Sequence, residues 1–449
     1  MSIKFPVRVL LAGSFAVAVP GWCQPPASED PLLAGLVQEA LAGNPDLRAA
    51  EAAMRAAQER PAQVSALADP VVSVLYTNEG WSPSLGTMPD TTLAILVSQD
   101  LPFPGKRDLR ARLAAIDAEQ VEQQLDRARR TVEASLRRAY SGLLQSRALA
   151  ELTREQAQLW RQIEGVARAR YSVGQGNQQD VLRTQVELTR VGQALAEEEA
   201  EAAIRLAEIN RLLGRPAGTP LDTTIAVQGV AAPEPLPVEL ERLRAVSPEL
   251  EAARNAIGRA QVALDIAKRE YKPDFGVHGG YMNRGGLDPM WQAGITVTLP
   301  IKRKRRASAV AEAELTLAAA GSRLAAVELQ LRLRTEERLA QLAAAQKIAL
   351  LYGEGIVPQG RMSVEAAIAS YQSARVPFIT VLESLRTLYG DRATLVRALA
   401  GQSRIRASLD EASLEATSDL VMAPAAEASA PVAGGAAASG GGAMAGMSR

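Results

Sequence analysis

Cysteine and histidine are nearly absent from this chain of 449 residues, which contains only Cys23 and His278. A single residue of each type excludes a disulfide framework and a His/Cys metal site within one chain. Nucleophilic catalysis would depend on His278 alone, so we predict no enzyme activity, no catalytic residue and no cofactor. Charge of one sign is not in excess either, because 50 Lys and Arg residues balance 50 Asp and Glu residues. This balance argues against a nucleic-acid partner.

Aromatic residues are also scarce, at 4% of the chain, whereas a globular core of this size would normally use more of them. The composition favours long, alanine-rich helices instead. After the N-terminal region, no stretch supplies the ~20 continuous apolar residues of a transmembrane helix. If the chain crosses a membrane, it must therefore do so with strands closed into a barrel.

The N-terminus has the pattern of a signal peptide spanning residues 1–23. Two basic residues precede an apolar run over 9–19, which is too short to span a bilayer. Small residues at Gly21 and Cys23 fit cleavage after Cys23. The alternative is lipidation of Cys23, although Trp22 stands where that reading prefers a small residue. Both readings imply export from the cytosol.

The remainder of the chain contains two copies of one plan, which we assign to residues 24–214 and 241–412. Landmarks recur in the same order at offsets of 198 to 203 positions, which chance similarity between helices would not maintain. A proline-rich segment over 215–240 is predicted to link the copies. The Ala/Gly-rich tail over 413–449 is predicted to be disordered.

Each copy contains a predicted pair of strands, in which apolar residues alternate with small or polar ones. The strands are expected at about 71–76 and 92–98 in the first copy, and at about 275–281 and 291–299 in the second. A loop containing Gly285, Gly286 and Pro289 is expected to join the second pair. Both a half-buried soluble sheet and a lipid-facing barrel show this alternation.

The distribution of aromatic residues favours the lipid-facing reading over a small soluble core. Seven of the 17 aromatic residues fall within 71–104 and 271–300, beside the strands. Trp and Tyr prefer the headgroup level of a membrane. The residues that we predict at the membrane interface are Tyr76, Trp81, Phe103, Phe275, Tyr281 and Trp291.

A long helical hairpin is predicted after each strand pair, over about 107–213 and 302–400. Apolar residues recur every seven positions from Val181 to Ile209, which is typical of a coiled-coil seam. Pro358 lies inside the second hairpin and has no counterpart in the first. Because proline removes a backbone donor, we predict that it kinks this hairpin and acts as a hinge, with a static bend as the alternative.

Three segments carry a resemblance to a known family: Gln99–Arg107, Arg170–Gly174 and Asn210–Gly214. Together with the duplication, they make residues 31–400 similar to the TolC family of outer-membrane efflux channels. The resemblance implies a mainly α fold with a small transmembrane β-barrel. It further implies a homotrimer that has a twelve-stranded barrel in the outer membrane and a barrel of helices across the periplasm.

The same resemblance implies the function of an exit duct in a tripartite efflux pump. The expected partners are a periplasmic adaptor protein, an inner-membrane pump of the RND type and outer-membrane lipid. Pro358 and the segment Pro102–Arg107 resemble metal-exporting members, which favours heavy-metal cations as substrates. A periplasmic adaptor or a coiled-coil structural protein of the envelope is the alternative, although the duplicated plan disfavours an adaptor.

In the family, the turns of the helical hairpins form the periplasmic tips. The resemblance implies adaptor docking at the first turn, at Tyr171, Val173, Gly174, Gln175 and Asp180, with Gln175 replacing the usual leucine. It implies a gate at the second turn, formed by Tyr371, Arg375 and Val376. Val376 stands where some members carry a gating arginine, and Arg375 is one residue earlier.

One further feature is the basic run from Lys302 to Arg306. The net charge and the exported compartment argue against nucleic-acid binding. A position near lipid phosphates, where a strand meets a helix, and simple solvation are the two remaining readings.

Overall fold

The computed structural model describes residues 30–84, 88, 90–223, 226–373 and 375–415. The predicted signal peptide and the two alternatives for Cys23 lie outside these residues, as does the tail from 416 onward. The described fold continues past the predicted boundary at 413. Ser413 is buried, and Glu415 accepts a hydrogen bond from Arg127 at 3.1 Å.

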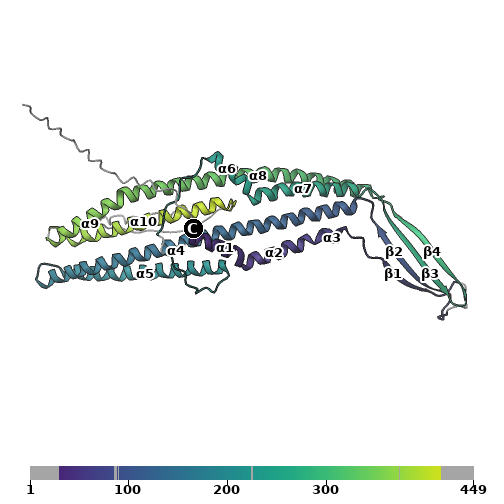
Figure 1. Ribbon diagram of the computed structural model, residues 1–449, viewed down its shortest axis with the longest axis horizontal. Coiled ribbons are helices and arrows are strands. Elements are labelled where there is room, and N and C mark those ends of the chain that lie inside the picture. Colours follow the sequence, from purple (N-terminus) through teal and green to yellow (C-terminus); the bar gives the residue numbers. More distant parts are fainter. Residues whose placement is uncertain (1–29, 85–87, 89, 224–225, 374, 416–449) are drawn as a thin grey trace, which may run out of the picture. The chain divides into compact units, whose positions relative to one another are not determined.

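The two copies of the plan are visible as two successive sets of elements (Figure 1). The first copy consists of α1 (Pro31–Gly43), α2 (Pro45–Gln58), α3 (Arg60–Ser65), β1 (Val71–Thr77), β2 (Thr92–Leu101), α4 (Lys106–Ser172) and α5 (Gln178–Leu213). The second copy consists of α6 (Leu236–Val246), α7 (Pro248–Arg269), β3 (Asp274–Arg284), β4 (Leu287–Thr298), α8 (Arg303–Leu350), the π-helix η1 (Leu351–Ile356), α9 (Val357–Gln372) and α10 (Phe378–Asp410).

Equivalent helices of the two copies begin with the same chemistry. The side chain of Asn44 caps α2 by accepting hydrogen bonds from the backbone amides of the first turn, and Ser247 caps α7 in the same way. Proline follows each cap, at a position where the missing N–H would have no partner inside the helix. The pairs Asn44-Pro45 and Ser247-Pro248 therefore mark equivalent helix starts in the two copies.

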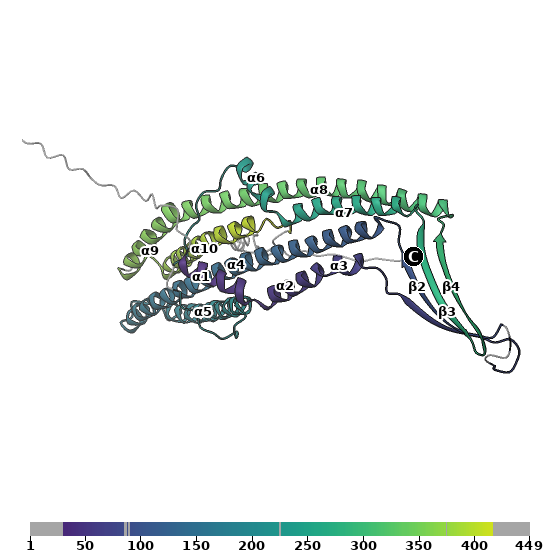
Figure 2. The ribbon, with the colours of Figure 1, turned by 45° about the vertical axis from the view of Figure 1, so that its right-hand side comes forward.

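The strands form one antiparallel sheet in the order β1-β2-β3-β4, so the two copies meet at the β2–β3 pair. Figure 2 shows the strands side by side beyond the ends of α4, α7 and α8. One face carries apolar rows, such as Val74, Ile95, Tyr281 and Trp291. The opposite face carries small and polar rows, such as Ser98, His278 and Gly294. The alternation in the sequence therefore corresponds to two chemically different faces.

The second strand pair is longer than the sequence predicts. β3 and β4 continue until only Gly285 and Gly286 separate their ladder, so Pro289 lies in β4 and not in a loop. The positive φ of 68° at Gly285 suits a tight hairpin turn. Similarly, α6 begins at Leu236, inside the segment predicted to be a linker.

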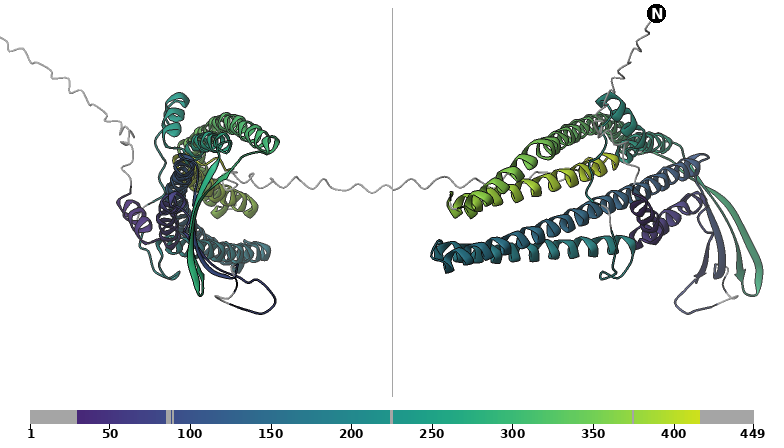
Figure 3. Two further views of the ribbon diagram at one scale, coloured as in Figure 1. Left: turned by 90° about the vertical axis from the view of Figure 1, so that its right-hand side faces the viewer. Right: turned by 60° about the vertical axis from the view of Figure 1, so that its left-hand side comes forward.

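The hairpins α4–α5 and α9–α10 have their turns at the same end, as Figure 3 shows. Buried apolar residues of both hairpins form one cluster near these turns. No helix among the described residues is long and apolar enough to cross a membrane.

Candidate functional site: the contact between the hairpin turns

The turn between α4 and α5 is closed by backbone geometry that its glycine permits. Gly174 has a φ of 74°, which favours glycine over residues with a side chain. The amide of Gln175 then donates to the carbonyl of Arg170 at 2.9 Å. Asn177 caps α5 by accepting from the amide of Gln179 at 3.2 Å. This turn fixes Arg170 and Asp180 at the two sides of one tip.

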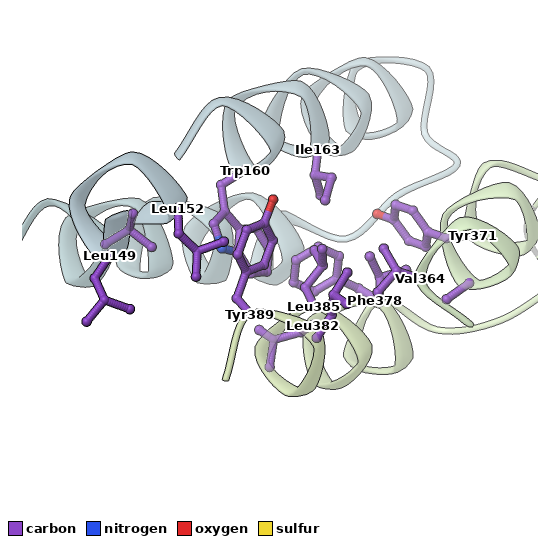
Figure 4. Close-up of a cluster of buried hydrophobic side chains, with 14 residues drawn as sticks. Leu149, Leu152, Trp160, Ile163, Val364, Tyr371, Phe378, Leu382, Leu385 and Tyr389 are labelled. Carbon is purple, nitrogen blue, oxygen red and sulfur yellow. The ribbon is translucent and has the colours of Figure 1, made fainter. Parts of the chain in front are cut away.

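The second turn directs aromatic side chains toward the first hairpin. Phe378, the first residue of α10, is almost fully buried and contacts the ring of Tyr371 edge-on at 5.6 Å between centroids. Trp160 of α4 lies 6.5 Å from the same Phe378 ring. Figure 4 shows these side chains between the two hairpins, and we call the buried set the tip cluster. Its members are Leu149, Leu152, Trp160, Ile163, Val191, Val364, Ala367, Tyr371, Phe378, Val381, Leu382, Leu385, Leu388 and Tyr389.

Tyr371 connects the hairpins through polar contacts as well. Its hydroxyl donates to a carboxylate oxygen of Asp180 at 3.3 Å. The guanidinium of Arg170 lies 4.6 Å from the centre of the Tyr371 ring and donates to the Tyr371 carbonyl. Burial, and next the charge of Asp180, raises the pKa of Tyr371 above its usual value. The hydroxyl therefore keeps its proton at neutral pH and remains the donor of this bond.

Two ion pairs extend the contact along the helices away from the tip. Arg386 of α10 binds both carboxylate oxygens of Glu187 of α5, at 2.5 and 3.2 Å. The side chain of Glu187 is only 9% exposed, so this forked pair is largely shielded from solvent. Arg392 of α10 binds Glu155 of α4 at 2.7 Å in a more exposed setting. The two hairpins are thus joined by apolar packing at the centre of their contact and by ion pairs at the edges of that contact.

The residues predicted for adaptor docking divide into two groups. Tyr171, Val173, Gly174 and Gln175 are exposed at the end of the first hairpin. Asp180 is partly buried instead, because it faces Tyr371 of the other hairpin. The exposed group is free to contact another protein, whereas Asp180 belongs to the contact inside the chain.

The residues predicted for a gate are also placed differently from one another. Tyr371 is buried in the tip cluster, and Val376 packs against that cluster from the edge. Arg375 is exposed, and within the described part of the chain its guanidinium makes no hydrogen bond or ion pair. The guanidinium that lies on Tyr371 is that of Arg170, which comes from the opposite hairpin.

Sequence reasoning did not identify Arg170, Trp160, Phe378, Glu187 or Arg386 as parts of this contact. Trp160 and Phe378 did offer a signal, because aromatic residues are scarce in the helical hairpins and these two are large enough to anchor a packed contact. The charged pairs offered none, since Glu187 and Arg386 are 199 positions apart and sit among many exposed charges.

Pro358 lies at the second position of α9, directly after the π-helix η1. A proline ring collides with the carbonyl four residues earlier in an α-helix, and a wider turn removes that collision. The predicted irregularity at Pro358 thus takes the form of one π-helical turn. Its role as a hinge stays a prediction.

The aromatic residues of the sheet lie toward two ends of its apolar face. Tyr281 and Trp291 pair across β3 and β4 near the hairpin turn. Phe275 lies at the opposite end, where it stacks on Phe103 at 6.4 Å between centroids. Six residues separate Phe275 from Tyr281, or ~20 Å along a strand at ~3.3 Å per residue. Of the other two predicted residues, Tyr76 lies at the end of β1 and Trp81 is fully exposed in the following loop.

An ion cluster around the buried Lys106 joins the sheet to the helices. Lys106, the first residue of α4, is 3% exposed and donates to Asp274 at 2.9 Å and Glu270 at 3.4 Å. Asp274 also accepts from the amide of Phe103 at 2.8 Å. Gly105 precedes this lysine with a φ of 86°, and an added Cβ would lie 2.2 Å from the Arg269 guanidinium. The segment Pro102–Arg107 therefore builds a joint between the copies.

Residues 36–215, which span the first copy, match the model of the family described as outer membrane efflux protein. The second copy repeats the same elements and shares one sheet with the first. The first copy therefore matches the outer membrane efflux protein family. None of the curated proteins compared with the chain matches it.

Solved structures show the same fold as this chain. The outer-membrane channel OprN is 19% identical, with a TM-score of 0.71, and the match covers 85% of this chain and 90% of that one. VceC of Vibrio cholerae is 20% identical, with a TM-score of 0.70 and coverage of 86% and 98%. MtrE of Neisseria gonorrhoeae, solved in an open state, is 16% identical, with a TM-score of 0.67 and coverage of 85% and 88%.

The predicted fold class is therefore confirmed, and the match of residues 36–215 agrees with the predicted resemblance. The chain has the fold of outer-membrane channels, and its first copy matches the family of outer membrane efflux proteins. The family is one of channels and not of enzymes. Among the described residues, no group of three or more His, Cys, Asp or Glu side chains is placed to hold a metal ion.

Proposed function

We propose that three copies of this chain form the exit duct of a tripartite efflux pump, with a heavy-metal cation as substrate. The proposal of a duct rests on the different surfaces at the two ends of the helices. A sheet with one exposed apolar face lies at one end of the helices, and two helical turns lie at the other. Such a chain can meet lipid at one end and a protein partner at the other.

The open edges of the sheet support assembly of several copies. β1 pairs only with β2, and β4 pairs only with β3, so both outer edges have unused backbone donors and acceptors. An unpaired strand edge is not tolerated in lipid. Three copies that pair β4 of one with β1 of the next would use every edge in a closed sheet of twelve strands. The face with Ser98, His278 and Thr296 would then line the passage.

A stripe on α8 supports the same assembly along the helices. Leu315 and Leu329 lie four helical turns apart on one side and are 72% and 71% exposed. Large apolar side chains with this exposure mark a surface that another chain covers. In the proposed trimer, helices of the neighbouring copy cover this stripe.

The contact between the hairpin turns supports a gate at the periplasmic tips. Tyr371, Asp180 and Arg170 connect the two hairpins of one chain near their turns. We propose that this contact belongs to the closed duct and that separation of the hairpins opens it. Pro358 and the adjacent π-helical turn would supply the bend. The proposed role of Arg375 is a contact with a neighbouring copy, because it is exposed.

The partners follow from this geometry and from the family. Channels of this family work as trimers with an adaptor and an inner-membrane pump. We propose that an adaptor docks on the exposed tip residues Tyr171, Val173 and Gln175, and that the pump is of the RND type. Heavy-metal cations are proposed because the segment Pro102–Arg107 and Pro358 resemble metal-exporting members.

Single-channel recording from purified trimers in a planar lipid bilayer tests the duct. We expect discrete conductance steps, a heat-labile trimer on gels and fractionation with the outer membrane. A periplasmic adaptor or a structural coiled coil would give a soluble or inner-membrane fraction and no conductance.

For the substrate, deletion of the gene should sensitise cells to heavy-metal cations. Sensitivity to organic drugs alone would contradict the metal proposal and leave the duct intact.

A further inference from the structure

The junction between β4 and α8 carries a dense cluster of exposed positive charge. Lys302, Arg303, Lys304 and Arg305 are consecutive, and all four are exposed. Within the described residues, none of their side chains forms an ion pair or a hydrogen bond with the protein. The next residue, Arg306, is different, because its guanidinium donates to the carbonyls of Glu270 and Lys302. We call the four exposed residues the basic cluster.

The first copy of the repeat provides an internal reference for this cluster. Leu101-Pro102 corresponds to Leu299-Pro300, which places Lys106 and Arg107 opposite Lys304 and Arg305. Lys106 is buried against Asp274 and Glu270, and Arg107 donates to the carbonyl of Ser65 at 2.6 Å. The cations of the first copy thus complete the joint between sheet and helices. The equivalent cations of the second copy, Lys304 and Arg305, are exposed and make no such contact among the described residues.

The local electrostatics make this cluster costly for the chain alone. Arg303 is the first residue of α8, where the helix dipole is positive, and the first turn of α8 contains no acidic residue. No side chain caps this end either. The nearby carboxylates Glu270 and Asp274 are already bound by Lys106. Four adjacent cations at a helix N-terminus therefore form a favourable site for an anion from outside the chain.

An apolar surface ends where the basic cluster begins. Ile295, Leu299 and Ile301 are 74%, 64% and 79% exposed, and Lys302 follows directly. Ile295 lies in β4 on the α8 side of the Tyr281–Trp291 pair, and Leu299 and Ile301 follow the end of β4 at Thr298. Apolar groups next to cations match the two parts of one molecule, a phospholipid with acyl chains and an anionic headgroup.

We propose that the basic cluster and the adjoining apolar residues bind anionic phospholipid in the periplasmic leaflet of the outer membrane. The proposal rests on the proposed function, which places the apolar face of the sheet in lipid. Phosphodiester oxygens accept hydrogen bonds from the arginines and lysines and cover the N-terminus of α8. The lipid thereby anchors the junction at the membrane surface.

Lipid titration of the purified full-length trimer, followed by native mass spectrometry, tests this site. The probes are phosphatidylglycerol and the zwitterionic phosphatidylcholine. We expect the wild type to bind phosphatidylglycerol at least tenfold more tightly. The variant K302Q/R303Q/K304Q/R305Q should lose this preference. Its affinity for phosphatidylglycerol should fall about fivefold for each cation removed. A milder variant, K302Q/K304Q, covers the case in which the fourfold variant does not assemble.

A matched control removes four exposed arginines on the helices far from the sheet: R161Q/R168Q/R183Q/R361Q. It has the same change of charge and should keep the preference for phosphatidylglycerol. Equal binding of both lipids by the wild type, or retained preference in K302Q/R303Q/K304Q/R305Q, would overturn the proposal. Displacement of phosphatidylglycerol by millimolar inorganic phosphate would also overturn it, because it would assign the cluster to a soluble anion. Channel conductance, recorded for every variant, separates failure of this site from failure of the duct.

Discussion

At the scale of single residues, Tyr371 is the point at which the two hairpins meet through both polar and apolar contacts. Its ring packs in the tip cluster and carries Arg170 on one face, while its hydroxyl binds Asp180. Burial raises the pKa of this hydroxyl, so the bond persists throughout the neutral range. The contact therefore responds to removal of either partner more than to a change of pH around neutrality.

Removing the hydroxyl or its acceptor should loosen the tips. Tyr371→Phe and Asp180→Asn each weaken one hydrogen bond to a carboxylate, at about 1 to 2 kcal/mol. In the proposed duct, the ratio of open to closed channels would rise about 5- to 30-fold. Single-channel recording measures this ratio. Tyr171→Phe is the matched control, because Tyr171 is exposed at the same tip. Unchanged open probability in both variants would remove Tyr371 from the gate.

The duplicated lysines permit a second test at this scale. Lys106→Gln leaves Asp274 and Glu270 without their buried partner, whereas Lys304→Gln alters an exposed side chain at the equivalent position. Breaking a fully buried pair costs about 3 to 5 kcal/mol, and the half-exposed carboxylates reduce this to roughly 1 to 3 kcal/mol. Thermal unfolding of the purified protein should show a lower midpoint for Lys106→Gln only. Equal midpoints for the two variants would contradict the structural role of Lys106.

The sequence identified Tyr371 but not its partners, for a physical reason. Spacing along one turn suggests neighbours such as Arg375, which is four residues away. The observed partners, Arg170 and Asp180, are 201 and 191 positions away and come from the other hairpin. Such a contact depends on how two long helical pairs are packed, and local periodicity carries no information about that.

At the scale of elements, the irregular passage from α8 to α9 distinguishes the second hairpin from the first. The first hairpin runs through α4 without interruption for 67 residues. The second changes to a π-helix over Leu351–Ile356 before Pro358. A proline was readily seen in the sequence, but its effect was not, because a kink and a π-helical turn both relieve the same collision.

Replacing this proline should regularise the element. Pro358→Ala restores a backbone donor, and we expect η1 to shorten or convert to α-helix. Amide hydrogen exchange at residues 351–358 should then slow by at least several-fold, and the open probability of the channel should fall. Val357→Ala is the control, because it keeps the proline and changes only the neighbouring side chain. Faster exchange in Pro358→Ala would contradict a strain imposed by the proline.

The strands were predictable from the sequence because apolar and polar residues alternate along them. Alternation of apolar and polar residues located all four strands, because opposite faces of the sheet meet different surroundings. The extent of β3 and β4 was underestimated, because Gly285, Gly286 and Pro289 suggested a longer loop. A ladder through Met282 and Met290 stabilises the strands beyond their alternating core.

At the scale of the whole molecule, the described residues contain surfaces that one copy leaves open. The edges of the sheet and the leucine stripe on α8 are two examples. The plan of two copies was predictable from repeated landmarks. The number of chains in the assembly was not, because it depends on how these open surfaces fit one another.

Charges on the α8 stripe should prevent assembly without unfolding the chain. Leu315→Asp together with Leu329→Asp places two carboxylates where the neighbouring copy is proposed to pack. We expect the trimer to give way to monomers in size-exclusion chromatography with light scattering, with helical content by circular dichroism unchanged. Val238→Asp is the control, because Val238 is a similarly exposed apolar residue on α6. Intact trimers of the double variant would show that the stripe lies outside the interface.

The placement of the tryptophans has a practical consequence. The described residues contain three: Trp160 buried between the hairpins, Trp291 on the apolar face of the sheet and Trp81 in the loop after β1. The fluorescence of each tryptophan is sensitive to a different environment. Emission of Trp160 should shift to the red when the tips part, brominated lipid should quench Trp291, and iodide in the bulk solvent should quench Trp81. The native protein thus carries its own optical probes for gating, insertion and loop exposure, without any attached label.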